Sequence, residues 1–260
     1  MSIPSEHGVA LPETKVQSSF FEQEGIRHYA EQVRPVEQED LENLQITPES
    51  LVHVVRHLVG ISVEARAKLI GQTFDDDGVE QVIDESFLAR QLETVGSKFH
   101  PVIVDPEKII GFCLEKIRVL LDSGQVPVWI KNSISRCLFA DFQIIVSHGE
   151  KTRLGIPEGN QLGNCALIKI TPEIADRVTV EQRGYGQSVD NIKVNVVRGV
   201  EPPLTDVLVF TLKKSADDQP PVFHTAYTGI LTVPLPRPSD QFPEELAYNQ
   251  DWWSQYAFVK

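Results

Sequence analysis

The sequence predicts an α+β fold in which a helical amino-terminal half packs against a largely antiparallel, twisted β-sheet built by the carboxyl-terminal half. Apolar residues recur at helical spacing up to Gly124, and extended β-branched and aromatic runs dominate from Val126 onward. The 260 residues are 41% hydrophobic, which is enough for a sizeable core. Runs of helices followed by runs of strands favour this class over a doubly wound fold.

Two helices carry clear start and stop signals. Thr47 and Pro48 supply an N-cap and a first helical residue, and the apolar stripe that follows ends at Gly60. Asp105 and Pro106 open a longer stripe that Gly124 terminates. Shorter helical patterns begin at Ser62 and around Phe87. We expect the helix after Pro106 to pack on the sheet.

Strands are expected where β-branched and aromatic runs are separated by Gly, Pro and Asn clusters. The predicted strands cover 128–130, 138–147, 166–170, 177–181, 192–197, 207–212 and 222–226. The segment VPLPRP should be extended, and the aromatic residues that follow it should dock the terminus back on the body: Trp252, Trp253, Tyr256 and Phe258.

We divide the chain into a polar arm (1–45), an acidic helical region (46–125) and a β-rich region (126–260), the last two allowed to form one domain. The arm includes a predicted helix over 25–33 that stops before Pro35. Residues 1–130 carry 11 Lys and Arg against 22 Asp and Glu, whereas residues 131–260 carry 13 against 15. The carboxyl half is therefore nearly neutral, and the acidic half is either a solvated shell or a surface that repels or masks polyanions.

The cysteines and the hydropathy of the sequence indicate the cellular compartment. The three cysteines, Cys113, Cys137 and Cys165, lack metal-site spacing and are expected to be reduced thiols. No apolar run approaches the roughly 20 residues that span a bilayer, and the first residues lack a signal-peptide core. We therefore expect a cytoplasmic protein without a membrane segment, a metal or another cofactor.

The segment 222–236, VFHTAYTGILTVPLP, is chemically the most unusual. Strand alternation would place His224 and Thr228 on one face and Thr225 and Tyr227 on the other, unless the strand twists, bulges or bends. A functional interpretation makes His224 a general acid or base beside a hydroxyl group. The alternative is that His224 and Tyr227 are satisfied polar groups at the edge of the core.

A second polar cluster, residues 147–153, follows the apolar strand LFADFQIIV, at a position where loops often carry function. His148 and His224 would form an acid–base pair, with Lys151 or Arg153 neutralising the charge that develops on a phosphorane. Metal-free RNA cleavage, in which the 2′-OH attacks its own phosphate, needs these groups. The alternative is a polar hairpin turn with an exposed tip.

A carboxyl-terminal strand reading His-Thr-Ala-Tyr before Gly and prolines, together with a His after an earlier strand, resembles the catalytic end of ribonuclease toxins. These belong to the superfamily that groups barnase, RelE and the colicin-type ribonucleases. The resemblance covers at most the second half of the chain and rests on about half a dozen residues. The long acidic part has no counterpart in the compact toxin domains. The resemblance implies RNA cleavage by His148, Arg153, His224, Thr225 and Tyr227.

Three further motifs favour structural interpretations. Residues 73–84 resemble a degraded EF-hand loop, but Thr73 and Asp84 replace the expected first and last ligands, which favours a plain acidic turn. His53 and His57 lie at i, i+4 without the Glu that a metalloprotease helix needs, so we expect surface histidines. The Gly-rich segment 183–187 matches no phosphate loop and is expected to be a hairpin.

The leading functional hypothesis is therefore a metal-independent RNA-cleaving or RNA-binding site in the carboxyl half. The runner-up is a non-enzymatic regulatory or accessory protein whose acidic helices and proline-rich tail bind a protein partner. The meeting of His148 and His224 at one opening would distinguish the first from the second.

Overall fold

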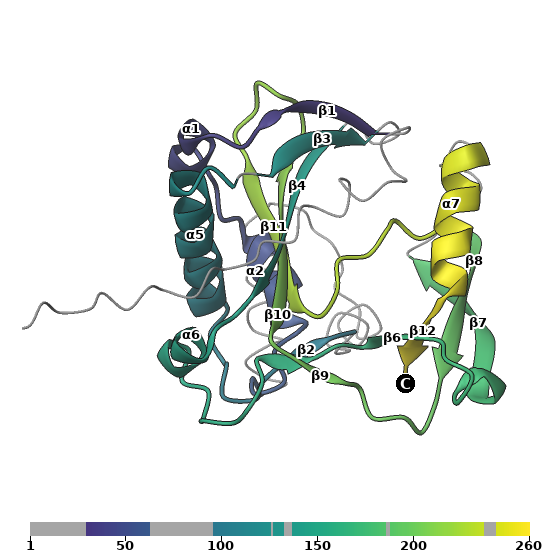
Figure 1. Cartoon of the computed structure of the whole chain (residues 1–260). Coiled ribbons are helices and arrows are strands. Elements are labelled where there is room, and N and C mark those ends of the chain that lie inside the picture. The colour runs from purple at the N-terminus through teal and green to yellow at the C-terminus, as the bar shows by residue number, and fades with distance from the viewer. Residues whose placement is uncertain (1–29, 63–95, 126, 133–136, 186–187, 237–242) are drawn as a thin grey trace, which may run out of the picture.

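The computed structural model describes residues 30–62, 96–125, 127–132, 137–185, 188–236 and 243–260. Over these ranges the chain forms twelve strands in three sheets and five short α-helices, with one 3-10 turn (Figure 1). The helices are α1 Gln38–Glu42, α2 Pro48–Val55, α5 Pro106–Asp122, α6 His148–Arg153 and α7 Pro243–Ser254.

A five-stranded sheet forms the centre of the molecule, with strand order β1-β3-β4-β10-β11 and antiparallel pairing throughout. Its strands are β1 Ala30–Pro35, β3 Val128–Asn132, β4 Leu138–Ile145, β10 Val207–Lys214 and β11 Val222–Thr228. Along β4, buried residues alternate with half-buried ones, so one face of the sheet is the core face and the other carries Phe139, Asp141 and Gln143.

Helix α5 covers the core face because its apolar stripe matches the buried face of the strands. Asp105 accepts hydrogen bonds from the first-turn amides, and Pro106 supplies a preset φ, so the helix begins where the sequence indicates. Its buried residues, including Ile109, Ile110 and Ile117, join Phe142 and Phe210 of the sheet in the main hydrophobic core. Helix α2 contributes Val54 to the same core, and the turn that follows it contributes Leu58.

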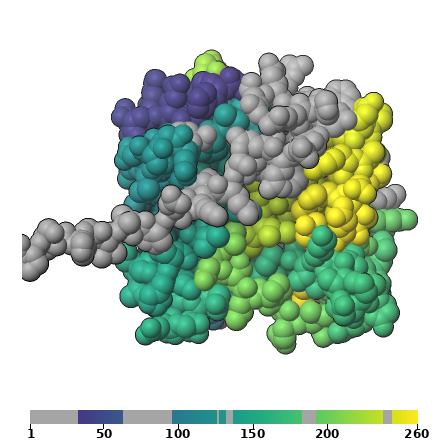
Figure 2. Space-filling view, in the orientation of Figure 1, coloured from purple at the N-terminus to yellow at the C-terminus, as the bar shows by residue number. Residues whose placement is uncertain are grey.

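A second lobe lies across the molecule from α5, where α7 lies beside the sheet β6-β12-β8-β7 (Figures 1 and 2). These strands are β6 Leu167–Lys169, β7 Val178–Tyr185, β8 Ser188–Val197 and β12 Tyr256–Val259. The aromatic terminus docks as predicted, since β12 pairs with β6 and β8 and Trp253 is buried. Strands β7 and β8 form the hairpin expected at the Gly-rich segment.

A small three-stranded sheet, β2-β5-β9, lies below the central sheet in Figure 1. It consists of β2 Lys98–Phe99, β5 Gly163–Asn164 and β9 Leu204–Thr205, each two residues long. The hydroxyl of Thr228 at the end of β11 donates to the carbonyls of Lys98 and Asn164, 3.2 and 2.6 Å away. The small sheet is thereby attached to the end of β11.

The predicted division into a helical first half and a β-rich second half is wrong. Strands make up most of the described structure, the first 125 residues contribute β1 and β2, and the second half contains α6 and α7. The physical reason is that β1, with the sequence AEQVRP, is a polar edge strand without an apolar run, and β2 is too short to show a period.

The start of the chain also differs from the expectation of an arm. Residues 30–35 pair with β3, and Gln45 forms an isolated parallel bridge with Val222 of β11. The described part of the expected helix over 25–33 is therefore a strand. The helices expected after Ser62 and around Phe87, and the EF-hand-like turn, lie outside the described residues. None of the helices in the described ranges has the length and hydropathy needed to cross a membrane.

Candidate functional site

A bulge in β11 lets the unusual residues of this strand share one side of the sheet. Consecutive residues of β10, Thr211 and Leu212, pair with Thr225 and Phe223, so His224 is an extra residue without a partner on β10. A bulge interrupts strand alternation and re-aims side chains. Phe223 and Ala226 are buried in the main core, whereas the His224 ring lies beside Phe139, which belongs to the opposite face.

Helix α2 runs along the outer edge of β11 and turns a polar stripe toward it. Its Thr47 cap accepts a hydrogen bond from the Ser50 amide, so the helix begins at Pro48, one residue before Glu49. Glu49 and His53 are four residues apart and lie on one face of the helix, and His57, in the turn that follows the helix, continues the same spacing. The adjacent Val54 and Leu58 enter the core and fix the orientation of that face.

The two histidine rings at the centre of this interface come from segments far apart in the sequence. The ring centroids of His53 and His224 are 5.0 Å apart with the planes inclined at 47°. Burial, and then the positive charges of His53 and Lys213, lower the pKa of His224 to about 4. Within the described part of the chain, neither ring nitrogen of His224 takes part in a hydrogen bond. Its nitrogens are therefore available to a ligand.

His53 has a carboxylate beside it. Its Nε2 lies 3.5 Å from Oε1 of Glu49, one helical turn earlier. Burial lowers the pKa of His53, and the negative charge of Glu49 opposes that effect. The pair is therefore asymmetric, because His53 forms an ion pair with Glu49, whereas the charge of Glu49 acts on His224 more weakly than the positive charges of His53 and Lys213 do.

His57 and Tyr227 extend the cluster toward the small sheet, with ring centroids 5.7 Å apart. Nδ1 of His57 donates to the carbonyl oxygen of Ser97 at 2.7 Å, and because a carbonyl can only accept, the proton lies on Nδ1. Burial lowers the pKa of His57 to about 4. Burial, followed by the negative charge of Asp141, raises the pKa of Tyr227, which remains a hydroxyl donor.

A row of polar side chains crosses the sheet next to this cluster. Asp141, Thr211 and Thr225 are direct neighbours on β4, β10 and β11 and therefore share a face. The Thr211 hydroxyl donates to Oδ1 of Asp141 at 2.6 Å. Burial raises the pKa of Asp141 to about 6, and the single hydrogen bond from Thr211 offsets this only in part. Perturbed titratable groups gathered at one place are typical of functional sites.

Cations surround the cluster although the protein as a whole is acidic. Arg56 and Lys213 lower the pKa of His53, and Arg56 and Lys98 lower that of His57, in each case after the larger effect of burial. Three cations, Arg56, Lys98 and Lys213, therefore lie within electrostatic range of the two imidazoles. Among the described residues, no group of three or more His, Cys, Asp or Glu side chains is placed to hold a metal ion.

The structure does not bring His148 and Arg153 to this cluster. Both belong to α6, which follows β4, and Arg153 is held by two hydrogen bonds to Glu115 of α5. His224 lies level with Ala140 and Asp141 in the sheet, and β4 continues for four more residues beyond Asp141, roughly 13 Å at about 3.3 Å per residue. The predicted polar hairpin turn at 147–153 is instead the helix α6.

The predicted site is thus partly assembled. His224, Thr225 and Tyr227 lie together on β11, while His53, His57, Asp141 and Lys213 were missed as members of the site. The i, i+4 histidine pair was visible in the sequence, but the expectation of surface positions is wrong, because both rings are half-buried against β11. A strand pattern alone gives no indication of which helix will lie beside it.

Comparison of the chain with protein-family profiles, with curated protein sequences and with solved structures finds no match. The chemistry of the α2–β11 histidine cluster, which we define as Glu49, His53, His57, His224 and Tyr227, is therefore what indicates a function.

Proposed function

We propose that the α2–β11 histidine cluster is a metal-independent acid–base site that cleaves RNA. The observation that carries the proposal is the contact between the His53 and His224 rings at 5.0 Å, beside the cation Lys213. Cleavage by the 2′-OH needs one group to accept a proton, one to donate a proton and a positive charge near the phosphate. The resemblance of the FHTAYTG strand to ribonuclease toxins supports the same chemistry.

The asymmetry of the pair assigns the roles. His224, which forms no ion pair with a described residue, accepts the proton of the 2′-OH as the oxygen attacks phosphorus. His53, whose imidazolium is stabilised by Glu49, donates a proton to the departing 5′-oxygen. The products are a 2′,3′-cyclic phosphate and a 5′-hydroxyl end, and the proton taken by one imidazole balances the proton given by the other.

Binding of the anionic phosphate favours the protonation state that the reaction needs, in which His53 is protonated and His224 is neutral. Both rings are mainly neutral at pH 7 in the free protein, because burial lowers both pKa values. A phosphodiester between them favours the imidazolium form. The pH profile of kcat/KM reports the pKa values of the free protein, so we expect its optimum on the acidic side of pH 7.

The direct test is incubation of the purified protein with mixed-sequence RNA in EDTA beside two variants. His224→Ala should lower cleavage by about 10²- to 10⁴-fold, the usual contribution of one acid–base group. His148→Ala, which removes an exposed imidazole on α6, is the matched control and should cleave like the parent protein. Replacing RNA by 2′-O-methyl RNA should abolish cleavage, because the attacking hydroxyl is gone.

Two outcomes contradict the proposal. If neither the parent protein nor its variants cleave RNA, the site is not a ribonuclease. If the parent protein and His224→Ala cleave equally, the activity comes from a contaminant or from another place on the protein.

A further inference from the structure

An aromatic ring and an unpaired cation lie next to His224 on the same face of the sheet. Phe139 of β4 and Lys213 of β10 are direct cross-strand partners, and cross-strand partners project to the same face. The ring of Phe139 meets that of His224 at a centroid distance of 6.2 Å, with the planes at 63°. These three residues come from three adjacent strands; the partner of Lys213 on β11 is Val222, and His224 lies two residues farther along that strand, at the bulge.

Among the described residues, Phe139 does not belong to the main core and Lys213 does not belong to an ion pair. Phe139 is half-buried on the face opposite α5, whereas Leu138, Ala140 and Phe142 on either side of it fill the main core. The Lys213 ammonium forms no ion pair with any residue that the structure describes, yet it lies close enough to act on the pKa values of His53 and His224. The neighbouring Lys214 is buried and fully engaged with Asp40 and Asp217.

A nucleotide has the matching chemistry. Bases of single strands stack on aromatic side chains, and phosphates are held by Lys and Arg. A base on Phe139 leaves its own phosphate within reach of Lys213 and of the imidazole that has no hydrogen-bond partner among the described residues. A double helix offers no unstacked base to such a ring.

We propose that Phe139 and Lys213 form a nucleotide subsite, in which Phe139 stacks an unpaired base of single-stranded RNA and Lys213 binds the phosphate that the 2′-OH attacks between His224 and His53. The inference rests on the proposed function for its choice of substrate. It predicts that the protein acts on loops and single strands and leaves paired RNA intact.

The binding experiment uses a short fluorescent single-stranded oligonucleotide with 2′-O-methyl riboses, which cannot be cleaved by the 2′-OH route. Phe139→Leu keeps an apolar side chain and should weaken binding roughly 5- to 150-fold, the range measured for loss of one base–aromatic stack. Phe139→Tyr restores an aromatic face and should bind like the parent protein. Thermal unfolding of each variant verifies that it is folded.

The contribution of Lys213 is measured from the salt dependence of the binding constant for the oligonucleotide. Lys213→Met should reduce the slope of log K against log salt by about 0.7, the value for one phosphate contact on a single strand. Lys169→Met is the matched control: Lys169 is an exposed strand lysine of the second lobe, also without an ion pair to a described residue, and its loss should leave the slope unchanged.

The outcomes separate the subsite from the cleavage reaction. Binding that is weakened by Phe139→Leu and kept by Phe139→Tyr supports the subsite, even if the parent protein cleaves no RNA. Equal binding by the parent protein and Phe139→Leu overturns the subsite, even if RNA is cleaved at His224. No binding of the oligonucleotide by the parent protein overturns it as well.

Discussion

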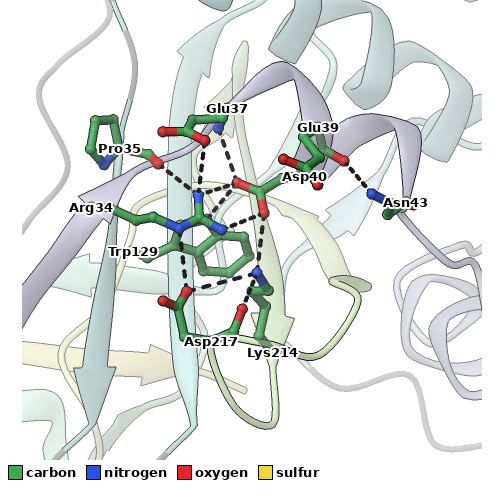
Figure 3. A network of polar contacts seen from close by, with 9 residues as sticks. All are labelled: Arg34, Pro35, Glu37, Glu39, Asp40, Asn43, Trp129, Lys214 and Asp217. Carbon is green, nitrogen blue, oxygen red and sulfur yellow. Dashed lines mark hydrogen bonds and ion pairs between the residues drawn. The ribbon is translucent and has the colours of Figure 1, made fainter.

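Two polar clusters lie on the central sheet, and they differ in how completely their charges are paired. The Asp40 network, which we define as Arg34, Asp40, Trp129, Lys214 and Asp217, surrounds one buried carboxylate with donors (Figure 3). The α2–β11 histidine cluster gathers several titratable rings around His224, which has no hydrogen-bond partner in the described part of the chain. The first arrangement serves stability, and the second leaves donor and acceptor capacity for a ligand.

The Asp40 network is saturated. Arg34 binds Asp40 through both terminal nitrogens at 2.7 and 2.8 Å, Trp129 donates its indole N–H at 2.9 Å, and Lys214 lies 3.2 Å away. Burial alone would raise the pKa of Asp40, but the hydrogen bonds from Arg34 and Trp129 hold it well below its usual range. The network joins β1, α1, β3 and β10, so it fastens the edge of the sheet.

The largest effect on stability is expected from Asp40→Asn. Asp40 and Lys214 are each 4% exposed, and removal of the carboxylate leaves buried positive charge without compensation. Loss of one partner of a buried ion pair costs about 3 to 5 kcal/mol of unfolding free energy, which denaturant titration measures. Asp217→Asn, at a carboxylate that is 53% exposed, is the control and should cost less than about 1 kcal/mol. Equal losses in both variants would refute the view that burial makes Asp40 important.

The second largest effect is the response of His57 to acid. Its pKa falls from about 6.5 in the unfolded chain to about 4 in the folded protein, so the folded state resists protonation. Stability from this group is therefore complete above pH 6.5 and is lost as the pH falls toward 4. At about 1.4 kcal/mol per pKa unit, the loss is up to about 3 kcal/mol.

His57→Gln tests this expectation, because glutamine does not titrate and its amide still donates to a carbonyl. Unfolding free energies measured at pH 7.5 and 4.5 should fall less for the variant than for the parent protein. A parallel decline of both proteins would mean that His57 is not held neutral by burial, and the contrast between the two clusters would lose part of its basis.

A smaller effect on the unfolding free energy is expected at Asp141, and its pH dependence is opposite to that of His57. Its pKa rises from about 3.8 to about 6 on folding, so stability from this group is complete below pH 4 and is lost as the pH rises through 6. Asp141→Asn keeps an oxygen for the Thr211 hydroxyl and removes the charge. The variant should be more stable than the parent protein at pH 8, by up to about 3 kcal/mol, and equal to it at pH 4.

Unfolding at the two pH values measures this difference, and a variant that is less stable at pH 8 would show that the ionised carboxylate stabilises the fold. The same variant sharpens the comparison with Asp40. Both carboxylates are removed from solvent, but Asp40 has donors enough to stay ionised and Asp141 has only one hydroxyl.

The local elements were predictable because their signals are local. The caps at Thr47 and Asp105 fix the starts of α2 and α5, and the strand runs fix β4, β10 and β11 close to their predicted bounds. The fold class was missed because β1 pairs through its backbone and shows no apolar run. Pairing of that kind depends on a distant strand and leaves no trace in the strand's own sequence.

The site was predictable only as far as one strand extends. The sequence of β11 contains the chemically reactive side chains His224, Thr225 and Tyr227. Strand alternation alone would put these side chains on opposite faces, so a bulge is needed to bring them to one face. Sequence order suggested the histidine after β4 as the partner of His224, whereas the structure places the ring of His53 beside it. Helix α2 reaches β11 through the bridge between Gln45 and Val222, a contact between residues far apart in the chain.

The smallest effect is expected at an ion pair with the same geometry as the first. Arg153 binds Glu115 through both terminal nitrogens at 2.9 and 2.6 Å, much as Arg34 binds Asp40, but this pair lies on the surface. Water solvates the two charges about as well apart as together, so Arg153→Gln should leave the denaturation midpoint unchanged within error. RNA cleavage should also be unchanged, because α6 does not reach His224.

A large loss of stability in that variant would mean that bidentate geometry, and not burial, gives the Asp40 network its strength. A loss of cleavage with the fold intact would return Arg153 to the reaction and would require α6 to approach β11 when RNA is bound. If neither stability nor cleavage changes, burial is the variable that distinguishes the two ion pairs. The bidentate Arg34–Asp40 pair stabilises the protein because solvent is excluded from it, and the bidentate Arg153–Glu115 pair on the surface contributes nothing measurable.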